Sequence, residues 1–247
     1  MKDKFFRIGY VLSCILFGVL AALFIAILVM TISGNPVYMI TKNGLYNLKP
    51  GNYVGLTLGF AAYGLFMLFL LIPRVRHNLN WTMKFTHELT HTLISMLFLA
   101  KIKEFVVKDR ECYVNYQSGP IGYVPITLSP YCIPIYTLMI FPFRFTGDGS
   151  YMFYFDVLIA FTYAFHIHSF IKQTRFTQRD IKNCGKLRSV LFIAWIHLTT
   201  LSIIMATPKG GVLNAFHRIF WKYPVAILTD PQWAVEYILN PTRYPLF

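Results

Sequence analysis

The sequence predicts an all-α polytopic membrane protein with about five or six transmembrane helices, a small β-hairpin and a proline-broken or re-entrant segment. Hydrophobic residues make up 56% of its 247 residues, and only 13% are charged. The mean hydropathy is +0.52. Such a composition is typical of a polytopic membrane protein rather than a soluble domain. Several apolar runs also reach the length that a helix needs to cross a bilayer.

Two transmembrane helices are expected near the N-terminus, at Ile8–Ser33 and Tyr53–Ile72. The first run is too long for the core of a signal peptide and lacks a small-residue cleavage site, so we expect it to be retained. A polar connection at Gly34–Gly51, with Asn-Pro and Lys-Pro-Gly turn signals, separates the two helices. Basic residues before the first helix and at Pro73–His77 after the second favour a cytoplasmic position for both segments.

The next helix, predicted at Asn78–Ala100, contains the sequence His87-Glu88-Leu89-Thr90-His91. At 100° per residue the two histidines lie about 40° apart on one helix face, so both rings can reach a single zinc ion. Glu88 projects beside them, where it can accept a proton from a water molecule that the metal activates. The continuous apolar part begins only at Leu93, which predicts a motif at modest depth and within reach of water. Charged groups are costly beside an apolar run, and this favours a metal site over a wet helix end.

Two segments after the motif differ from simple transmembrane helices. Phe105–Val107 and Cys112–Tyr116 flank a charged turn at Lys108–Glu111, a pattern typical of a β-hairpin. Both an ordinary surface hairpin and an edge strand that pairs with an extended substrate fit this pattern. Gly119–Phe143 is apolar but contains five prolines. Because proline breaks helical hydrogen bonding, we expect a broken span or a re-entrant hairpin packed against protein.

The C-terminal half is predicted to contain two further transmembrane helices, at Tyr151–Ile171 and Ser189–Ala206. The connection between them, Lys172–Arg188, holds six basic residues and one acidic residue, Asp180. The tail mixes aromatic, proline and basic residues, and Val212–Tyr223 is suited to lie flat at the membrane interface. The predicted organisation is therefore two N-terminal helices (1–80), a membrane core (81–206) and an interfacial tail (207–247).

Charge and cysteine content restrict the function classes. The formal net charge is +13, and the basic residues gather in loops beside the apolar runs, as the positive-inside rule predicts for contact with membrane lipid. No basic stripe with interleaved aromatic residues lies outside these runs, which argues against nucleic acid as a partner. The four cysteines are scattered without a C-x-x-C pair, so neither a disulfide framework nor a cysteine zinc site is expected.

A catalytic zinc site with two histidines needs a third ligand. Asp180, His166, His168 and Asp156 are the candidates. If Gly119–Phe143 dips into the membrane and returns, all basic regions share the cytoplasmic side, and Asp180 then lies at the depth of the motif. This arrangement is favoured and makes Asp180 the first choice, followed by His166. Full crossing of the proline-containing segment would favour Asp156 instead.

With these features placed, Trp81–Ser189 resembles the site-2-protease-like intramembrane zinc metalloproteases. The resemblance rests on the HELTH motif in a membrane helix and on the β-rich stretch after it. It also rests on Leu128-Ser129-Pro130-Tyr131 and on Gln178-Arg179-Asp180-Ile181. The family fold implied is an all-α membrane core with a small β element.

The resemblance implies that His87 and His91 bind Zn²⁺, that Glu88 is the general base, and that Asp180 completes the site. The implied activity is that of a zinc metallopeptidase that hydrolyses peptide bonds of a membrane-protein or peptide substrate. The competing class is a non-catalytic membrane scaffold or a transporter-like protein with a vestigial motif. The expected location is a bacterial inner membrane, with the N-terminus in the cytoplasm.

Overall fold

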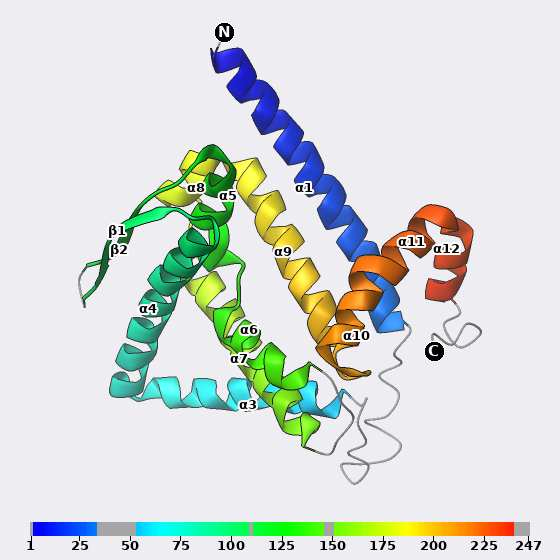
Figure 1. Ribbon diagram of the computed structural model, residues 1–247. Helices are drawn as coiled ribbons and strands as arrows, with labels where there is room; N and C mark the ends of the chain where they lie inside the picture. The colour runs from blue at the N-terminus through cyan, green and yellow to red at the C-terminus, as the bar shows by residue number, and fades with distance from the viewer. Residues whose placement is uncertain (1, 34–52, 109–110, 146–150, 240–247) are drawn as a thin grey trace.

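The computed structural model describes residues 2–33, 53–108, 111–145 and 151–239, and most of them are helical (Figure 1). Within these residues, four helical segments are long and apolar enough to cross a membrane. They belong to α1 (Lys2–Ser33), α3 (Val54–Phe66) with the 3-10 turn that follows it, α7 (Met152–Gln173) and α9 (Lys186–Ala206). The predicted class, a helical membrane protein, is confirmed. The polar connection predicted at Gly34–Gly51 lies outside the described residues.

The proline-containing segment is broken, as predicted. It forms α5 (Pro120–Leu128), a 3-10 turn at Ser129–Tyr131, and α6 (Ile135–Ile140), and the two halves are bent by 93°. Proline accounts for the bend, since it has no N–H to donate and restricts the residue before it. The pair adds a fifth candidate span if it counts as one crossing.

The two ends of this broken segment contact opposite ends of α9. At one end, α5 packs against α9 and against the short helix α8 (Arg179–Cys184) that precedes it. At the other end, the carbonyl of Phe145 accepts a hydrogen bond of 3.1 Å from the backbone N–H of Leu213, which lies beyond the end of α9. The segment therefore runs along the bundle and does not return to its starting end, in contrast to the arrangement that charge alone favoured.

The motif helix α4 spans Pro73–Leu97, so it begins one turn earlier than predicted, with proline at its first position. Proline suits this position because its missing N–H has no partner there in any helix. The basic sequence Pro73–His77 is thus the first turn of α4 rather than only the end of the preceding helix. In the described part of the chain, α4 is not among the helices apolar enough to cross a membrane. In Figure 1 it runs obliquely from the end of α3 at the lower left to the hairpin near α8 at the top.

Hydrogen bonds attach α4 to the C-terminal end of α7. Lys172 Nζ donates to Asn80 Oδ1 at 2.5 Å, and Gln173 Oε1 lies 3.1 Å from His87 Nδ1. The N-terminal part of α4 is thereby joined to the C-terminal end of α7, and its C-terminal part reaches α5 and the hairpin. If α4 does not cross the membrane, the broken segment can cross it and still leave Pro73–His77 and Lys172–Arg188 on the same side. This arrangement agrees with the positive-inside rule.

The predicted β-hairpin is confirmed. β1 (Lys101–Val107) and β2 (Cys112–Gln117) pair in antiparallel fashion, with Phe105 opposite Val114 and an irregularity between Ile102 and Glu104. Leu99, just after α4, adopts a left-handed conformation with φ of 53°, which turns the chain sharply from helix into strand. Both strands pack against α4.

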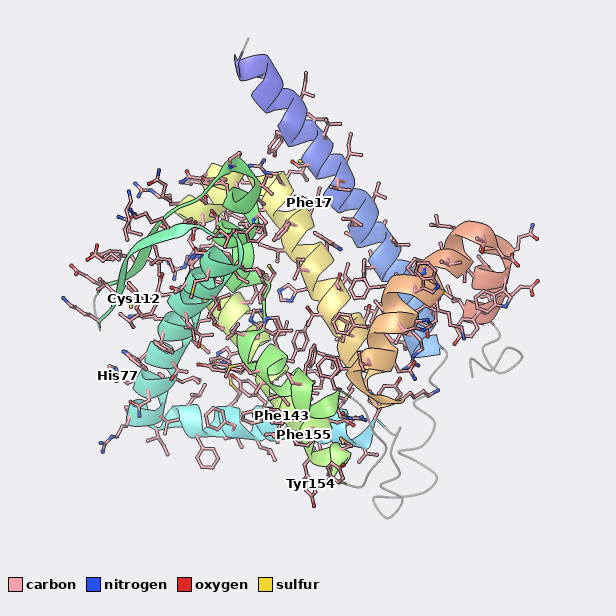
Figure 2. All side chains as sticks on the ribbon, viewed as in Figure 1. Phe17, His77, Cys112, Phe143, Tyr154 and Phe155 are labelled. Carbon is pink, nitrogen blue, oxygen red and sulfur yellow. The ribbon has the colours of Figure 1, made fainter. Side chains whose placement is uncertain are left out.

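Aromatic and glycine contacts hold the long helices together. Phe17 of α1 stacks on Trp195 of α9 with ring centroids 5.8 Å apart, and its side chain lies between these two helices in Figure 2. Between α3 and α7, a Cβ on Gly55 would lie 2.9 Å from the Asp156 Cβ, and a Cβ on Gly59 would overlap the Val157 carbonyl oxygen. The spacing of these glycines allows close approach of the two backbones, as in other membrane helix pairs.

The tail is helical and packs on the bundle. It forms α10 (Gly211–His217), a π-helical turn, α11 (Tyr223–Thr229) and α12 (Pro231–Leu239). α10 contacts α9, while α11 and α12 contact α1. The Arg218 guanidinium donates 2.7 Å hydrogen bonds to the carbonyls of Ala206 and Lys209 and so satisfies the C-terminal end of α9. An interfacial position for this tail stays a prediction.

Candidate metal centre

His87, His91 and Asp180 meet at the motif end of the bundle. Each offers one ligand atom, and the three atoms lie within 4.8 Å of one another. The two histidines come from one face of α4, as their spacing predicts. Asp180 comes from the first turn of α8, and its Oδ2 lies 4.0 Å from His91 Nε2. His91 is buried, whereas Asp180 remains one-third exposed, so the cluster lies at the edge of the protein interior.

Hydrogen bonds orient both imidazole rings. His91 Nδ1 lies 2.8 Å from the carbonyl oxygen of Ile126, and His87 Nδ1 lies 3.1 Å from Gln173 Oε1. Because these oxygens only accept, each Nδ1 carries the hydrogen and each Nε2 keeps its lone pair. Burial lowers the pKa of His87 to about 3, and the neighbouring His91 acts in the same direction. Both features produce the neutral tautomer that binds metal ions through Nε2.

Tyr131 orients the carboxylate. Its hydroxyl donates a 3.0 Å hydrogen bond to Asp180 Oδ2, and its ring lies edge-to-face against His87 at 5.2 Å. The side chain is only 1% exposed, so the hydroxyl is held in place by packing. Its backbone carbonyl accepts a 2.9 Å hydrogen bond from His197 Nε2 of α9. Tyr131 therefore connects α9, α8 and the motif helix.

Glu88 lies beside the cluster and beneath the hairpin. It is 8% exposed, and its carboxylate accepts a hydrogen bond from the backbone N–H of Val114 in β2. Burial raises the pKa of Glu88 to about 7, and the negative charge of Asp180 adds to this effect. A carboxyl group with a pKa near neutrality can both accept and return a proton.

The other candidate ligands lie elsewhere. Asp156 forms a buried ion pair with Arg144 at the opposite end of the bundle, with Nε and Oδ1 3.0 Å apart. His168 Nδ1 is 2.8 Å from the Tyr63 hydroxyl. His166 lies with its ring 5.3 Å from that of His197 and is not part of the three-residue group. Of the four alternatives, only Asp180 is brought to the motif.

Sequence reasoning did not assign roles to the residues that orient the ligands. Tyr131 belongs to the Leu128-Ser129-Pro130-Tyr131 segment, but a tyrosine in a proline-rich run does not indicate a carboxylate partner. Gln173 lies within the basic connection Lys172–Arg188, where nothing in the sequence marks it as a histidine partner, and the Ile126 carbonyl is a backbone atom. A buried tyrosine near prolines could have been noted as a group that needs a hydrogen-bond partner. The partner itself becomes apparent only in three dimensions.

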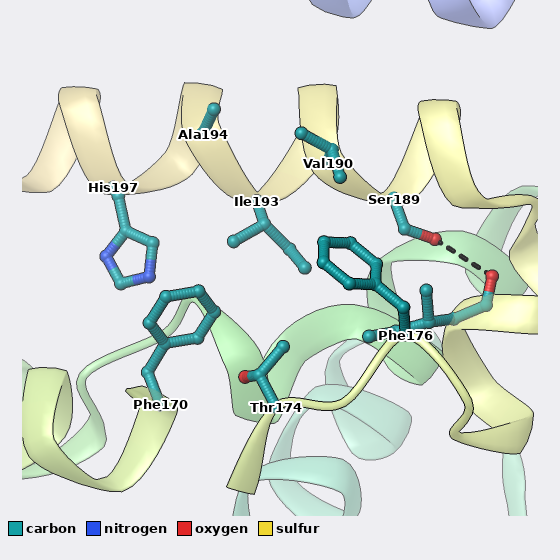
Figure 3. Close-up of a pocket in the computed structure, with 9 residues that line it drawn as sticks. Phe170, Thr174, Phe176, Ser189, Val190, Ile193, Ala194 and His197 are labelled. Atoms are coloured by element: carbon teal, nitrogen blue, oxygen red, sulfur yellow. Dashed lines mark hydrogen bonds between the residues drawn. The ribbon is translucent and has the colours of Figure 1, made fainter. Parts of the chain in front are cut away.

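Two hollows lie near this centre. A polar cleft of about 610 Å³ opens over His87 and Glu88 and is bordered by Cys112, Gln173 and Gln178. A second pocket of about 310 Å³ lies between the end of α7, α8 and α9; Phe170, Phe176 and Ile193 line it, as Figure 3 shows. There the Ser189 hydroxyl donates to the Ile181 carbonyl at 3.3 Å and joins α9 to α8. Of these two, the first hollow contains His87 and Glu88, whereas the second is lined mainly by apolar side chains.

The donor set suits a divalent zinc-like cation. Two neutral imidazoles and one carboxylate, with room for a water molecule beside them, are the ligands that catalytic Zn²⁺ sites use. The fold and this cluster define the chain as a polytopic membrane protein with a His-His-Asp group at one end of its helical bundle. Comparison with protein-family models, curated proteins and solved structures finds no match.

Proposed function

We propose that this membrane protein is a zinc metallopeptidase that hydrolyses peptide bonds of membrane-associated substrates, as the resemblance of its sequence implies. The observation that carries the proposal is the convergence of His87, His91 and Asp180 to within 4.8 Å beside the buried Glu88. The three side chains would hold the ion. When bound, zinc supplies Lewis acidity that lowers the pKa of a water molecule and polarises a carbonyl group.

Glu88 acts as the general base. Its position beside the ligands and in the lining of the polar cleft lets it accept a proton from the attacking water molecule and return it to the leaving nitrogen. The hydrogen bond from the Val114 N–H fixes the carboxylate and leaves its other lone pairs for this proton transfer. Gln173 and the Ile126 carbonyl hold the histidine rings in the tautomer that the site needs.

The hairpin gives the site a way to present an extended chain. β1 pairs with β2, and in the described part of the chain this sheet has two strands. A substrate segment that adds to its edge would recover the backbone hydrogen bonds lost when a helix unwinds. β2 also supplies the contact to Glu88, which places the hairpin beside the base.

The motif end faces the cytoplasm in this proposal. The basic connection Lys172–Arg188 leads to this end, and the basic turn Pro73–His77 precedes Asn80, which bonds to Lys172. The start of α1 also lies here, because the Arg188 guanidinium is 5.2 Å from the centre of the Tyr10 ring. The positive-inside rule assigns such an end to the cytoplasmic side of a bacterial inner membrane.

The deciding experiment compares wild type with Glu88→Ala in proteoliposomes that contain a membrane-anchored reporter peptide. Wild type should cleave the reporter, and Glu88→Ala should bind zinc normally but leave the peptide intact. Mass spectrometry identifies the products, and elemental analysis gives the zinc content. Cleavage retained by purified Glu88→Ala would contradict the mechanism. Wild type without zinc after repletion would favour a scaffold or transporter-like protein with a vestigial motif.

A further inference from the structure

We infer that the polar cleft over Glu88 binds the carboxylate-bearing part of a peptide, so the substrates are segments with acidic residues on the aqueous side of the scissile bond. This inference rests on the proposed function, because it names the substrate class of the same site. It adds a specificity that neither the motif nor the metal ligands contain.

The cleft is lined by charges of mainly one sign. Lys84 of α4, Lys172 at the end of α7 and Arg175 in the following connection line it, and all three are exposed. Glu88 is the only acidic residue among the described residues that line it. Charges of one sign that line a cleft concentrate its field and attract a ligand of the opposite sign.

The arrangement exceeds what membrane topology requires. The positive-inside rule demands basic residues at this end of the bundle, but it does not demand that they converge. Here they come from two separate parts of the chain and border one opening. Lys172 is held in place by its hydrogen bond to Asn80, so one of these cations has a fixed position beside α4.

Geometry connects this basic opening to the proposed chemistry. The cleft of about 610 Å³ is lined by His87 and Glu88 as well as by the three cations. A peptide whose scissile bond lies at Glu88 must therefore place its neighbouring residues against these cations. These cations attract aspartate and glutamate side chains and repel lysine and arginine.

Cys112 provides a test of the field that needs no cleavage. Its thiol lines the same cleft, and Cys132 and Cys184 are buried, so replacing Cys14 with serine leaves Cys112 as the accessible thiol among the described cysteines. In phosphatidylcholine nanodiscs, Cys112 is treated with an anionic sulfonatoethyl or a cationic trimethylammonioethyl methanethiosulfonate. The rate constant for modification of Cys112 by each reagent is divided by the rate constant of the same reagent with 2-mercaptoethanol, which corrects for the reagents' different intrinsic reactivities. Labelling of Cys112 should favour the anionic reagent, and Lys84→Glu with Arg175→Glu should reduce this preference about tenfold.

A matched control separates the cleft from overall charge. Arg74→Glu with Lys186→Glu makes the same change in net charge at exposed positions outside the cleft and should preserve the preference of Cys112. Equal labelling by both reagents in the protein with native Lys84 and Arg175 would overturn the inference. Loss of the preference in the control pair, as strong as in the cleft pair, would overturn it as well.

Peptide binding tests the ligand class directly. The probes are a fluorescein-labelled hexapeptide with two glutamates and its twin with two glutamines, and their affinity for the Glu88→Ala protein is measured by anisotropy. The glutamate peptide should bind more tightly, by about 1.5- to 5-fold for each cation it contacts. Lys84→Glu with Arg175→Glu should abolish the difference.

The two peptides could bind with equal affinity even though Cys112 reacts faster with the anionic reagent. That combination would indicate that the cleft contacts anionic lipid instead, and it would overturn the assignment of a peptide ligand. Neither the labelling rates nor the anisotropy needs hydrolysis, so failure of the protease proposal remains separately visible in the cleavage assay.

Discussion

His91 Nε2 lies 4.0 Å from Asp180 Oδ2, although one residue belongs to the motif helix α4 and the other to the short helix α8. Two connections make this approach possible. Tyr131 donates to the same carboxylate oxygen, and the Ile126 carbonyl orients the imidazole. Both come from the proline-broken segment, which therefore shapes the candidate metal centre as well as running along the bundle.

Zinc content should depend on three residues. His87→Ala, His91→Ala and Asp180→Ala should each lose the bound ion, because each removes one of the three proposed protein ligands. His166→Ala is the matched control, since it deletes a buried histidine near the site but outside the group. Elemental analysis after zinc repletion measures the stoichiometry. Full zinc content in Asp180→Ala would exclude Asp180 as a ligand.

Removal of the Tyr131 hydroxyl should weaken zinc binding without unfolding the protein. Tyr131→Phe keeps the ring but leaves Asp180 without its donor, and loss of such a partner raises the metal dissociation constant about 10- to 100-fold. Competition with a chromophoric chelator gives the constant. Tyr136→Phe, which loses a hydroxyl bonded to Thr86, should bind zinc normally. An unchanged dissociation constant in Tyr131→Phe would show that packing alone positions the carboxylate.

The contact between α3 and α7 should be sensitive to size at Gly59. Gly59→Leu forces a side chain into the Val157 carbonyl and the Ala160 Cβ, and such overpacking lowers the free energy of unfolding by about 1–3 kcal/mol. Gly64→Leu lies on the same helix with open space around it and should have little effect. Unfolding in dodecyl sulfate, followed by circular dichroism, compares the two. Equal stability of both variants would contradict the close helix contact.

Replacing one partner of the buried ion pair at the far end of the bundle should destabilise the protein more than replacing both. Arg144 is fully buried and Asp156 is 4% exposed. Arg144→Met leaves a buried carboxylate without its cation, a change that costs about 3–5 kcal/mol. The double variant Arg144→Met, Asp156→Leu should recover part of this loss in the same unfolding assay. A double variant as unstable as the sum of the two single ones would show that the charges do not interact.

The position of the basic residues can be mapped with single cysteines. In a protein without its native cysteines, positions 76 and 175 should share one side of the membrane and position 209 the other. In intact cells, a membrane-impermeant maleimide should label only position 209, and after permeabilisation it should label all three. Opposite behaviour of positions 76 and 175 would place α4 across the membrane and contradict the cytoplasmic position proposed for both.

Local pattern was sufficient for much of the fold. The long apolar runs predict helices because length and hydropathy are properties of neighbouring residues, and they end within a few residues of the observed bounds of α7 and α9. The hairpin followed from β-branched and aromatic residues around a charged turn. The pairing of His87 with His91 followed from helical geometry alone.

Only the tertiary structure decided how α4 lies and which acid joins the motif. From the sequence, the motif helix was expected to enter the membrane, so charge balance required the broken segment to return. In the structure α4 runs obliquely from the end of α3 to the hairpin and is not among the described helices that are apolar enough to cross a membrane. The broken segment runs along the bundle. The order of residues determined the two histidines, because they share one helix turn. Packing of α5, α8 and Tyr131 selected Asp180, since a contact between distant segments depends on how helices meet rather than on any local pattern.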